Sequence, residues 1–260
     1  MKIKANGISI NYQVDGPDGA PWLVLSNSLA TNLTMWDEQA RELGRALRVL
    51  RYDQRGHGLS EAPAGRYPFD LLITDALALM DALAIRKAHF GGLSMGGATA
   101  LGLAQKHADR LDRVIVCDSP CQSTPTSSQQ WEERIVVAQA QGMGALVEPT
   151  IARWFPPEII KANPPYLDKV RAMIRSTPVD GFIGCAAALA NHDFRSAVAT
   201  TTRPLLFIVG EKDGPQPAAM RDMHQKVPGS GFVELPGAGH ISNMDQPALF
   251  TKAIAEFLAA

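Results

Sequence analysis

Short runs of apolar and β-branched residues recur along the chain, separated by turn residues and by stretches with a helical pattern. The runs lie at 8–14, 22–25, 48–52, 88–90, 114–117, 205–209 and 232–235. Most of these runs are typical of strands buried on both faces of a sheet. The N-terminal segment MKIKANGISINYQ alternates instead, which predicts an alternating strand at this end of the chain.

The stretches between these runs predict helices. Apolar residues at helical spacing, namely Leu72, Ala76, Leu79 and Leu83, predict a helix over 69–83. Similar patterns predict helices over 98–108 and 248–258. Strands that alternate with helices build a mostly parallel sheet covered by helices, so the pattern predicts an α/β fold.

The alternation stops in the middle of the chain, between residues 119 and 199. This segment has no convincing strand, and its helical-looking pieces are interrupted by Pro120, Pro125, Pro149, Pro156, Pro157, Pro164, Pro165 and Pro178. The strand pattern returns with TTRPLLFIVG. We therefore expect a core domain made of residues 1–118 and 200–260, with residues 119–199 inserted in it as a helical cap.

The composition excludes several classes of partner. Of the 260 residues, 46% are apolar and 20% charged, which is ordinary for a globular protein. The formal net charge of −1 gives no electrostatic reason to bind nucleic acid or an anionic membrane, so we expect a small-molecule partner. A membrane-spanning run of about 18 apolar residues and the order of a signal peptide are both missing, which favours the cytoplasm. The sequence does not indicate an oligomeric state.

The cysteines and histidines indicate neither disulfides nor metal. Cys117, Cys121 and Cys185 are an odd number in a long chain, and Cys117 lies in the apolar run RVIVC. Buried or idle thiols are therefore expected. No paired CxxC or HExxH spacing occurs, so no metal site is predicted.

One serine has the surroundings of a nucleophile. In HFGGLSMGGAT, Ser94 lies between the run at 88–90 and a predicted helix, with Gly92 and Gly96 two residues to either side. This G-x-S-x-G pattern is typical of a sharp strand-to-helix turn that strains the nucleophile and needs the two glycines for clearance. The N-terminus of the helix then directs free amides and a positive dipole at the reacting centre. The alternative is a glycine-rich loop whose hydroxyl bonds a local backbone group.

A base and an acid follow Ser94 in the order that α/β hydrolases use. Asp213 follows the strand-like LLFIVG, and His240 lies in FVELPGAGHISNMDQP just before the last helix. Serine needs an imidazole to accept its proton, and the imidazole needs a carboxylate to fix its tautomer. We therefore predict Ser94, His240 and Asp213 as the catalytic residues.

Other residues compete for the roles of base and acid. His57, in RGHGLS, follows an earlier strand and is out of order, and its glycine-rich setting suggests a shaped loop under the site. Asp118 ends the RVIVCD strand, a position from which some α/β hydrolases take their acid. Glu211 is a weaker local rival to Asp213. Asp213 is preferred because its loop follows the strand that precedes the histidine loop.

An acyl-transfer site also needs donors for the developing oxyanion, usually two backbone amides. We expect one from Met95, directly after the nucleophile. The second is expected from Leu29, in the loop 25–31 that follows the third strand. The alternative interpretation of this loop is a simple polar turn.

At this point the chain resembles a known family. The segments LSNSLATNLTMW, LRYDQRGHGLSEAP, FGGLSMGG, ARWF and GHISNMDQP are similar to those of 3-oxoadipate enol-lactonases. The resemblance covers nearly the whole chain and implies the α/β-hydrolase fold, with an eight-stranded, mostly parallel sheet and an inserted cap. It also implies a cofactor-free enzyme of bacterial aromatic catabolism, in which Ser94, Asp213 and His240 match the triad. The loop sequence Asn27-Ser28-Leu29 is a more specific marker than the serine motif.

The resemblance further implies a substrate. This is a small five-membered enol-lactone with an acetate arm, which hydrolysis opens to a 3-oxo diacid. Its carboxylate needs a partner in an apolar pocket, and arginine suits a planar carboxylate best. Trp131 and Arg134 resemble the family's cap segment and are expected as apolar wall and carboxylate anchor. Trp154 is expected to bind substrate too, and Arg153 beside it is a second candidate anchor; alternatively, cap arginines are solvated and tryptophans only pack.

Some positions depart from the family pattern. They are Ala30, where glycine is common, Gln54, much of 120–191, and the segment Gly214-Pro215-Gln216-Pro217 after the acid. These departures affect the pocket, so three other hydrolytic activities stay open: a general carboxylesterase, another lactonase, and a cofactor-free perhydrolase. A different class is a hydrolase-fold ligand receptor without turnover, against which the intact triad argues.

Overall fold

Eight strands form one sheet in the order β1-β2-β4-β3-β5-β6-β7-β8 in the computed structural model, which describes residues 1–259. The strands are β1 (Lys2–Ala5), β2 (Ile8–Asp15), β3 (Trp22–Ser26), β4 (Arg48–Tyr52), β5 (Ala88–Leu93), β6 (Leu111–Cys117), β7 (Leu205–Gly210) and β8 (Gly231–Leu235). From β4 to β8 neighbouring strands are parallel, whereas β2 pairs antiparallel with both β1 and β4. The mostly parallel sheet of the sequence prediction is confirmed.

The N-terminal segment forms two strands where the alternating pattern predicted one. Asn6 and Gly7, with φ of 46° and 78°, both lie in the left-handed region. Positive φ at two consecutive residues is typical of the tight turn of a hairpin, and Asn-Gly is its preferred sequence. The chain therefore reverses there, and Ile3 of β1 pairs with Ile10 of β2.

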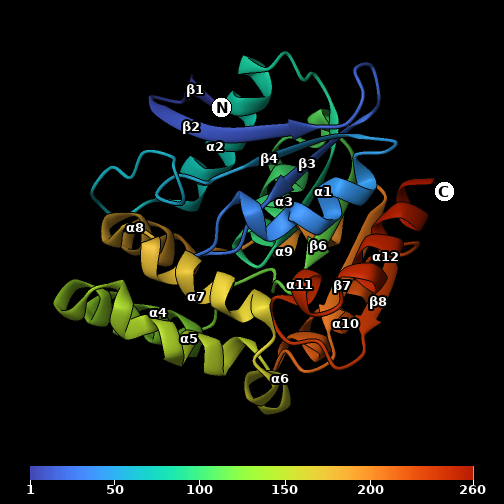
Figure 1. Cartoon of the computed structure of the whole chain (residues 1–260). Coiled ribbons are helices and arrows are strands. Elements are labelled where there is room, and N and C mark those ends of the chain that lie inside the picture. The colour runs from blue at the N-terminus through green and yellow to red at the C-terminus, as the bar shows by residue number, and fades with distance from the viewer. Residues whose placement is uncertain (260) are drawn as a thin grey trace.

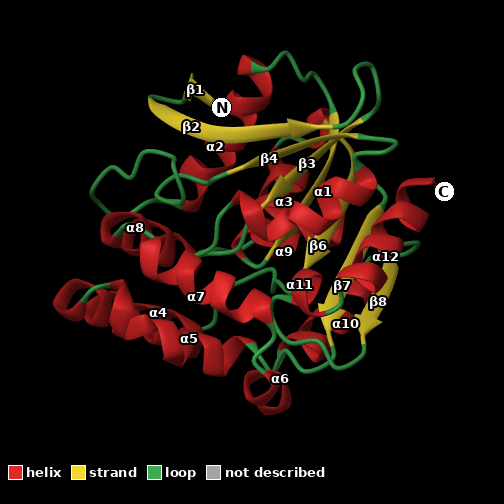
Figure 2. Cartoon of the chain, in the orientation of Figure 1, coloured by secondary structure: helices red, strands yellow, loops and turns green. Residues whose placement is uncertain are grey.

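Helices surround the sheet (Figures 1 and 2). They are α1 (Asp37–Leu43), α2 (Phe69–Ala82), α3 (Met95–Lys106), α4 (Pro125–Gln141), α5 (Val147–Trp154), α6 (Pro157–Ala162), α7 (Pro165–Ser176), α8 (Val179–Ala190), α9 (Arg195–Thr200), α10 (Gln216–Gln225), α11 (Ser242–Asp245) and α12 (Pro247–Ala259), with short 3-10 helices at Leu33–Trp36, Ala108–Arg110 and Met143–Leu146. The predicted helices correspond to α2, α3 and α12. Helix α3 begins earlier than predicted, directly after Ser94.

The central strands lie in the core of the molecule. Every residue of β7 is buried, and Leu23, Val24 and Leu25 of β3 have no exposed surface. Helices cover both faces of a parallel sheet, so its strands need apolar side chains on either side. This explains why these strands read as continuous apolar runs in the sequence.

Helices α4 to α8 follow β6 and precede α9 and β7. Figure 1 shows them gathered on one side of the molecule, where α4 packs against α8 and α5 against α7. Between 119 and 199, the described chain forms no strand beyond an isolated bridge of Gln122 with Asp193. Helix α9 lies against α3. Within residues 1–259, none of the helices is long and apolar enough to cross a membrane.

Candidate active site

Ser94 occupies the turn between β5 and α3 in a strained conformation. Its φ is 56° and its ψ −113°, a combination that a residue with a side chain rarely adopts. The N–H of Ser94 donates to the carbonyl of Cys117 at the end of β6, over 2.8 Å. The backbone is therefore held in place from the neighbouring strand, as a strand-to-helix nucleophile turn requires.

The glycines around Ser94 allow a close approach of strand and helix. A Cβ atom at Gly92 would lie 2.1 Å from the carbonyl oxygen of Gly96, and one at Gly96 would lie 2.1 Å from the carbonyl oxygen of Ser26. Neither position therefore accepts a larger residue without a shift of the backbone. The spacing of the sequence motif has this steric cause.

Asp213 and His240 lie together at the ends of two neighbouring strands. Asp213 follows β7 and His240 follows β8, and His240 Nδ1 lies 2.8 Å from Asp213 Oδ2. The two side chains are 12% and 9% exposed, so water competes little for this contact. A donor at Nδ1 leaves Nε2 free to accept a proton. Both residues line a cavity of about 270 Å³ that Ser94 also lines.

The rival acid Asp118 is buried and makes other contacts. Its Oδ1 accepts from the N–H of Gly210 over 2.8 Å, and its Oδ2 accepts from the hydroxyl of Ser242 over 2.5 Å. Burial, and then the charge of Asp213, raise the pKa of Asp118 well above its usual range. Asp118 thus joins the loops that carry Asp213 and His240, and it does not line the cavity.

The other rivals lie outside the cavity as well. Glu211 accepts from the N–H of Gly237 over 2.8 Å on the protein surface. His57 is fully buried, and its Nε2 accepts from the N–H of Ala30 over 2.9 Å. His57 Nδ1 lies 3.0 Å from the carbonyl oxygen of Arg55, to which it donates. Burial lowers the pKa of His57, which favours the neutral ring that this contact needs.

The loop between β3 and Leu33 presents the predicted oxyanion donor. Leu29 lines the cavity, and in the described part of the chain the N–H of Leu29 has no hydrogen-bond partner. Met95 is the first residue of α3, so its N–H has no carbonyl in the preceding turn to bond. Ala30 has a φ of 58°, which explains why glycine suits this position.

Two side chains brace this loop. The amide nitrogen of Asn27 donates to the carbonyls of Ser28 and Thr31, both over 3.0 Å. The amide nitrogen of Gln54 donates to the carbonyl of Asn27 over 2.5 Å. Gln54, a departure from the family pattern, therefore supports the loop that carries Leu29. The sequence contains no signal for this contact.

The helices α4 and α5 bring two tryptophans and two arginines to the cavity. The Cζ atoms of Arg134 and Arg153 lie 4.6 Å and 5.5 Å from the ring centroid of Trp131. The ring of Trp154 stacks on that of His240, with centroids 5.7 Å apart and an angle of 30°. Burial lowers the pKa of Arg134 and lowers that of Arg153 to about 9.

The end of helix α5 is also bonded to the segment that carries His240. The N–H of His240 donates to the carbonyl of Trp154 over 2.7 Å. A Cβ at Gly239 would lie 2.1 Å from the same carbonyl oxygen, so the two segments are in close contact. Sequence reasoning placed Trp154 against the substrate; the structure shows that it lines the cavity and supports His240 as well.

Residues 19–253 match the model of the alpha/beta hydrolase family. The chain belongs to this family. Among curated alpha/beta hydrolase relatives, 3-oxoadipate enol-lactonases 2 and 1 of Acinetobacter baylyi are each 34% identical to it, over 97% and 99% of this chain and 94% and 96% of theirs.

Two solved structures are similar along the full chain. The enol-lactonase from Burkholderia xenovorans is 40% identical with a TM-score of 0.96, and each chain covers 100% of the other. A thermophilic esterase from Thermogutta terrifontis, with malate bound, is 30% identical with a TM-score of 0.94, covering 100% of this chain and 98% of its own.

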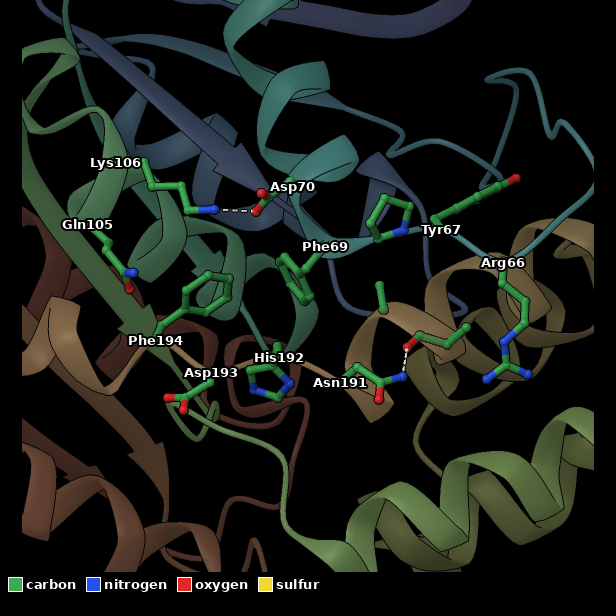
Figure 3. Close-up of a pocket in the computed structure, with 13 residues that line it drawn as sticks. Arg66, Tyr67, Phe69, Asp70, Gln105, Lys106, Asn191, His192, Asp193 and Phe194 are labelled. Atoms are coloured by element: carbon green, nitrogen blue, oxygen red, sulfur yellow. Dashed lines mark hydrogen bonds and ion pairs between the residues drawn. The ribbon is translucent and has the colours of Figure 1, made fainter.

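This alpha/beta hydrolase has a second cavity, of about 590 Å³, beside α2, α3 and the end of α8 (Figure 3). Charged side chains on its wall are paired: Lys106 Nζ lies 2.5 Å from Asp70 Oδ1, and Arg66 pairs with Glu132. None of the predicted catalytic residues lines it, but His192 lines both cavities. The predicted catalytic residues lie together on the wall of the smaller cavity.

Some residues of the smaller cavity have no motif that marks them. They are Gln122, Ser127 and Gln130 around the start of α4, Leu189 and His192 near the end of α8, and Pro215 and Gln216 after Asp213.

The three cysteines are free thiols, and burial raises the pKa of Cys117 well above its usual range.

Proposed function

We propose that this alpha/beta hydrolase opens a small enol-lactone that carries a carboxylate, 3-oxoadipate enol-lactone, to 3-oxoadipate. The observation that carries the proposal is the contact of His240 with Asp213 in the same cavity as Ser94. The identity of the lactone is supported by the 3-oxoadipate enol-lactonases among the curated relatives. Cationic side chains on the cavity wall suit an anionic substrate.

The first half of the reaction forms an acyl-enzyme. His240 Nε2 accepts the proton of Ser94 while Ser94 Oγ attacks the lactone carbonyl, and Asp213 stabilises the imidazolium through Nδ1. The backbone N–H groups of Leu29 and Met95 hold the negative oxygen of the tetrahedral intermediate. The ring C–O bond then breaks, and His240 returns its proton to the departing enol oxygen.

The second half releases the product. Water loses a proton to His240 and attacks the acyl carbonyl, the bond to Ser94 Oγ breaks, and the serine recovers its proton. The enol becomes a ketone by moving a proton to carbon. One lactone and one water thus give one 3-oxoadipate.

Helices α4 to α8 act in this proposal as the cap that shapes the pocket. Trp131 forms an apolar wall, Arg134 holds the carboxylate of the acetate arm, and Trp154 completes the wall beside His240. Both tryptophans and Arg134 line the cavity together with Ser94, which supports this assignment. On binding, the substrate carboxylate loses hydrating water and gains a contact with the guanidinium of Arg134, which is itself partly desolvated by burial.

The proposal is tested by a panel of substrates on the purified protein. We expect the ultraviolet absorbance of the enol-lactone to disappear far faster than the spontaneous rate, and faster than short aryl esters are cleaved. A general esterase, which the similar thermophilic esterase supports as a second candidate, would reverse that order. Lactone loss at the spontaneous rate with an intact fold would exclude the proposed substrate.

A further inference from the structure

Two arginines from different helices lie over one indole ring in the cavity. Arg134 belongs to α4 and Arg153 to α5, and each Cζ atom lies within 5.5 Å of the ring centroid of Trp131. Both guanidinium groups line the cavity that contains Ser94. The like charges are close enough that Arg134 contributes to lowering the pKa of Arg153.

Neither guanidinium has a protein counter-ion. Among residues 1–259, no hydrogen bond or ion pair involves the side chain of Arg134 or Arg153, whereas the buried Arg55 lies 2.6 Å from Asp75. Arg153 is exposed and lines the cavity, while the neighbouring protein and the charge of Arg134 lower its pKa to about 9. Two neighbouring like charges without a counter-ion repel each other, and an anion between them would relieve that repulsion.

The two arginines differ in their distance from the reaction. Arg153 also lies 6.0 Å from the ring centroid of Trp154, the ring that stacks on His240. The charge of Asp213 raises the pKa of Arg153 and so partly offsets the lowering by burial. For Arg134 the charge that raises the pKa is that of Glu133 instead. Arg153 is thus the arginine nearer the catalytic residues, and Arg134 the more distant one.

We propose that the cavity has two carboxylate positions, one at Arg134 for the carboxylate that the substrate brings and one at Arg153 for the carboxylate that hydrolysis creates. The inference rests on the proposed function. Water opens a neutral ring ester to a carboxylate and an enol, with release of one proton, so a substrate with one negative charge becomes a product with two. The second arginine matches the second charge.

The arrangement gives the site a specificity that a single anchor lacks. A dicarboxylate of the product's length spans both guanidinium groups and makes two charge-assisted contacts, whereas a monocarboxylate makes one. Arg153 is therefore a product-binding and specificity-determining residue. Product-like dicarboxylates are expected to compete with substrate for the free enzyme.

Calorimetry on the Ser94→Ala protein tests the proposal with adipate and hexanoate, which have equal chain length and differ in one carboxylate. We expect adipate to bind about ten- to a hundredfold more tightly, the usual effect of one hydrogen-bonded charge pair. Adding Arg153→Met should reduce adipate binding to about the level of hexanoate. Arg175→Met is the matched control, because Arg175 is an exposed arginine of α7 outside the cavity and its loss should leave the preference intact.

Two results would overturn the proposal. One is equal binding of adipate and hexanoate to the Ser94→Ala protein, a comparison that needs no cap variant. The other is an unchanged adipate preference in the Arg153→Met protein, or in Arg153→Gln if the methionine variant fails to fold by circular dichroism. The measurement involves no turnover, so failure of the enol-lactone assay, which would exclude the proposed function, is a separate result.

Discussion

The backbone N–H of Ala30 donates to Nε2 of the buried His57 over 2.9 Å. Nδ1 of the same ring donates to the carbonyl of Arg55, so both ring nitrogens are used and the tautomer is set. The imidazole therefore links the RGHGLS segment to the loop that carries Leu29. His57, which is out of order as a catalytic base, thus helps to hold the loop of residues 25–31 in place.

This contact predicts a loss of stability at acidic pH. Burial lowers the pKa of His57 from 6.5, so the unfolded chain binds a proton there before the folded protein does. The contribution is fully present above about pH 6.5 and falls as the pH drops through the lowered pKa of the folded state. Urea unfolding at pH 7.5 and pH 5 measures the acid loss, which is the decrease in the free energy of unfolding between these two pH values. This acid loss should be smaller in His57→Gln than in the wild type.

A matched variant separates this contact from a general effect of histidines. His107, at the end of α3, lies outside the loop of residues 25–31, and His107→Gln should lose as much stability at acidic pH as the wild type. His89 and His192 also have pKa values lowered by burial, so His57→Gln should reduce the acid loss without abolishing it. An acid loss as large in His57→Gln as in the wild type would contradict the assignment.

The two buried carboxyl groups near the site should respond differently to the same substitution. Asp213→Asn presents an amide to His240 Nδ1 and favours the wrong tautomer, which lowers kcat by about 10⁴-fold in a serine triad. Asp118→Asn removes support from Gly210 and Ser242, and we expect it to lower the free energy of unfolding with a smaller loss of kcat. Steady-state kinetics of both variants decide the matter. The reverse ranking of kcat would make Asp118 the acid.

The steric need for glycine next to Ser94 can be tested by measuring stability. A Cβ at Gly96 would lie 2.1 Å from the carbonyl oxygen of Ser26, so Gly96→Ala should lower the free energy of unfolding by about 1–3 kcal/mol or more. Gly144→Ala is the control, because nothing lies within 4 Å of a Cβ there. Denaturant unfolding measures both. If the two variants proved equally stable, the motif would not need glycine for steric reasons.

Much of the core and the order of the candidate triad could be predicted because each leaves a local pattern. Buried strands appear as apolar runs, and the tight turn at Ser94 appears as two glycines at fixed spacing. Asp213 could be preferred over Asp118 from chain order, since α/β hydrolases follow one order. The Asn6-Gly7 hairpin also has a local signal, but the alternating pattern on both sides concealed it.

Contacts across the chain left no such pattern. Ala30 and His57 are 27 residues apart, and their hydrogen bond depends on how two loops fold against each other. Arg153 is one of several arginines between residues 119 and 199, and only the folded arrangement of α4 and α5 brings it over Trp131. Gln54 likewise braces Asn27 through the folded backbone. Such contacts need the structure because side-chain type and spacing do not determine them.

The central claim is that Ser94 attacks the enol-lactone, and the most direct test is kcat/KM for that lactone in the wild type and in Ser94→Ala, measured by the loss of ultraviolet absorbance. Ser94→Ala retains the cavity and replaces only the nucleophilic oxygen. We expect rapid turnover by the wild type and a loss of about 10⁴-fold or more in the variant, as for removal of a serine nucleophile. Unchanged turnover in Ser94→Ala would contradict the account.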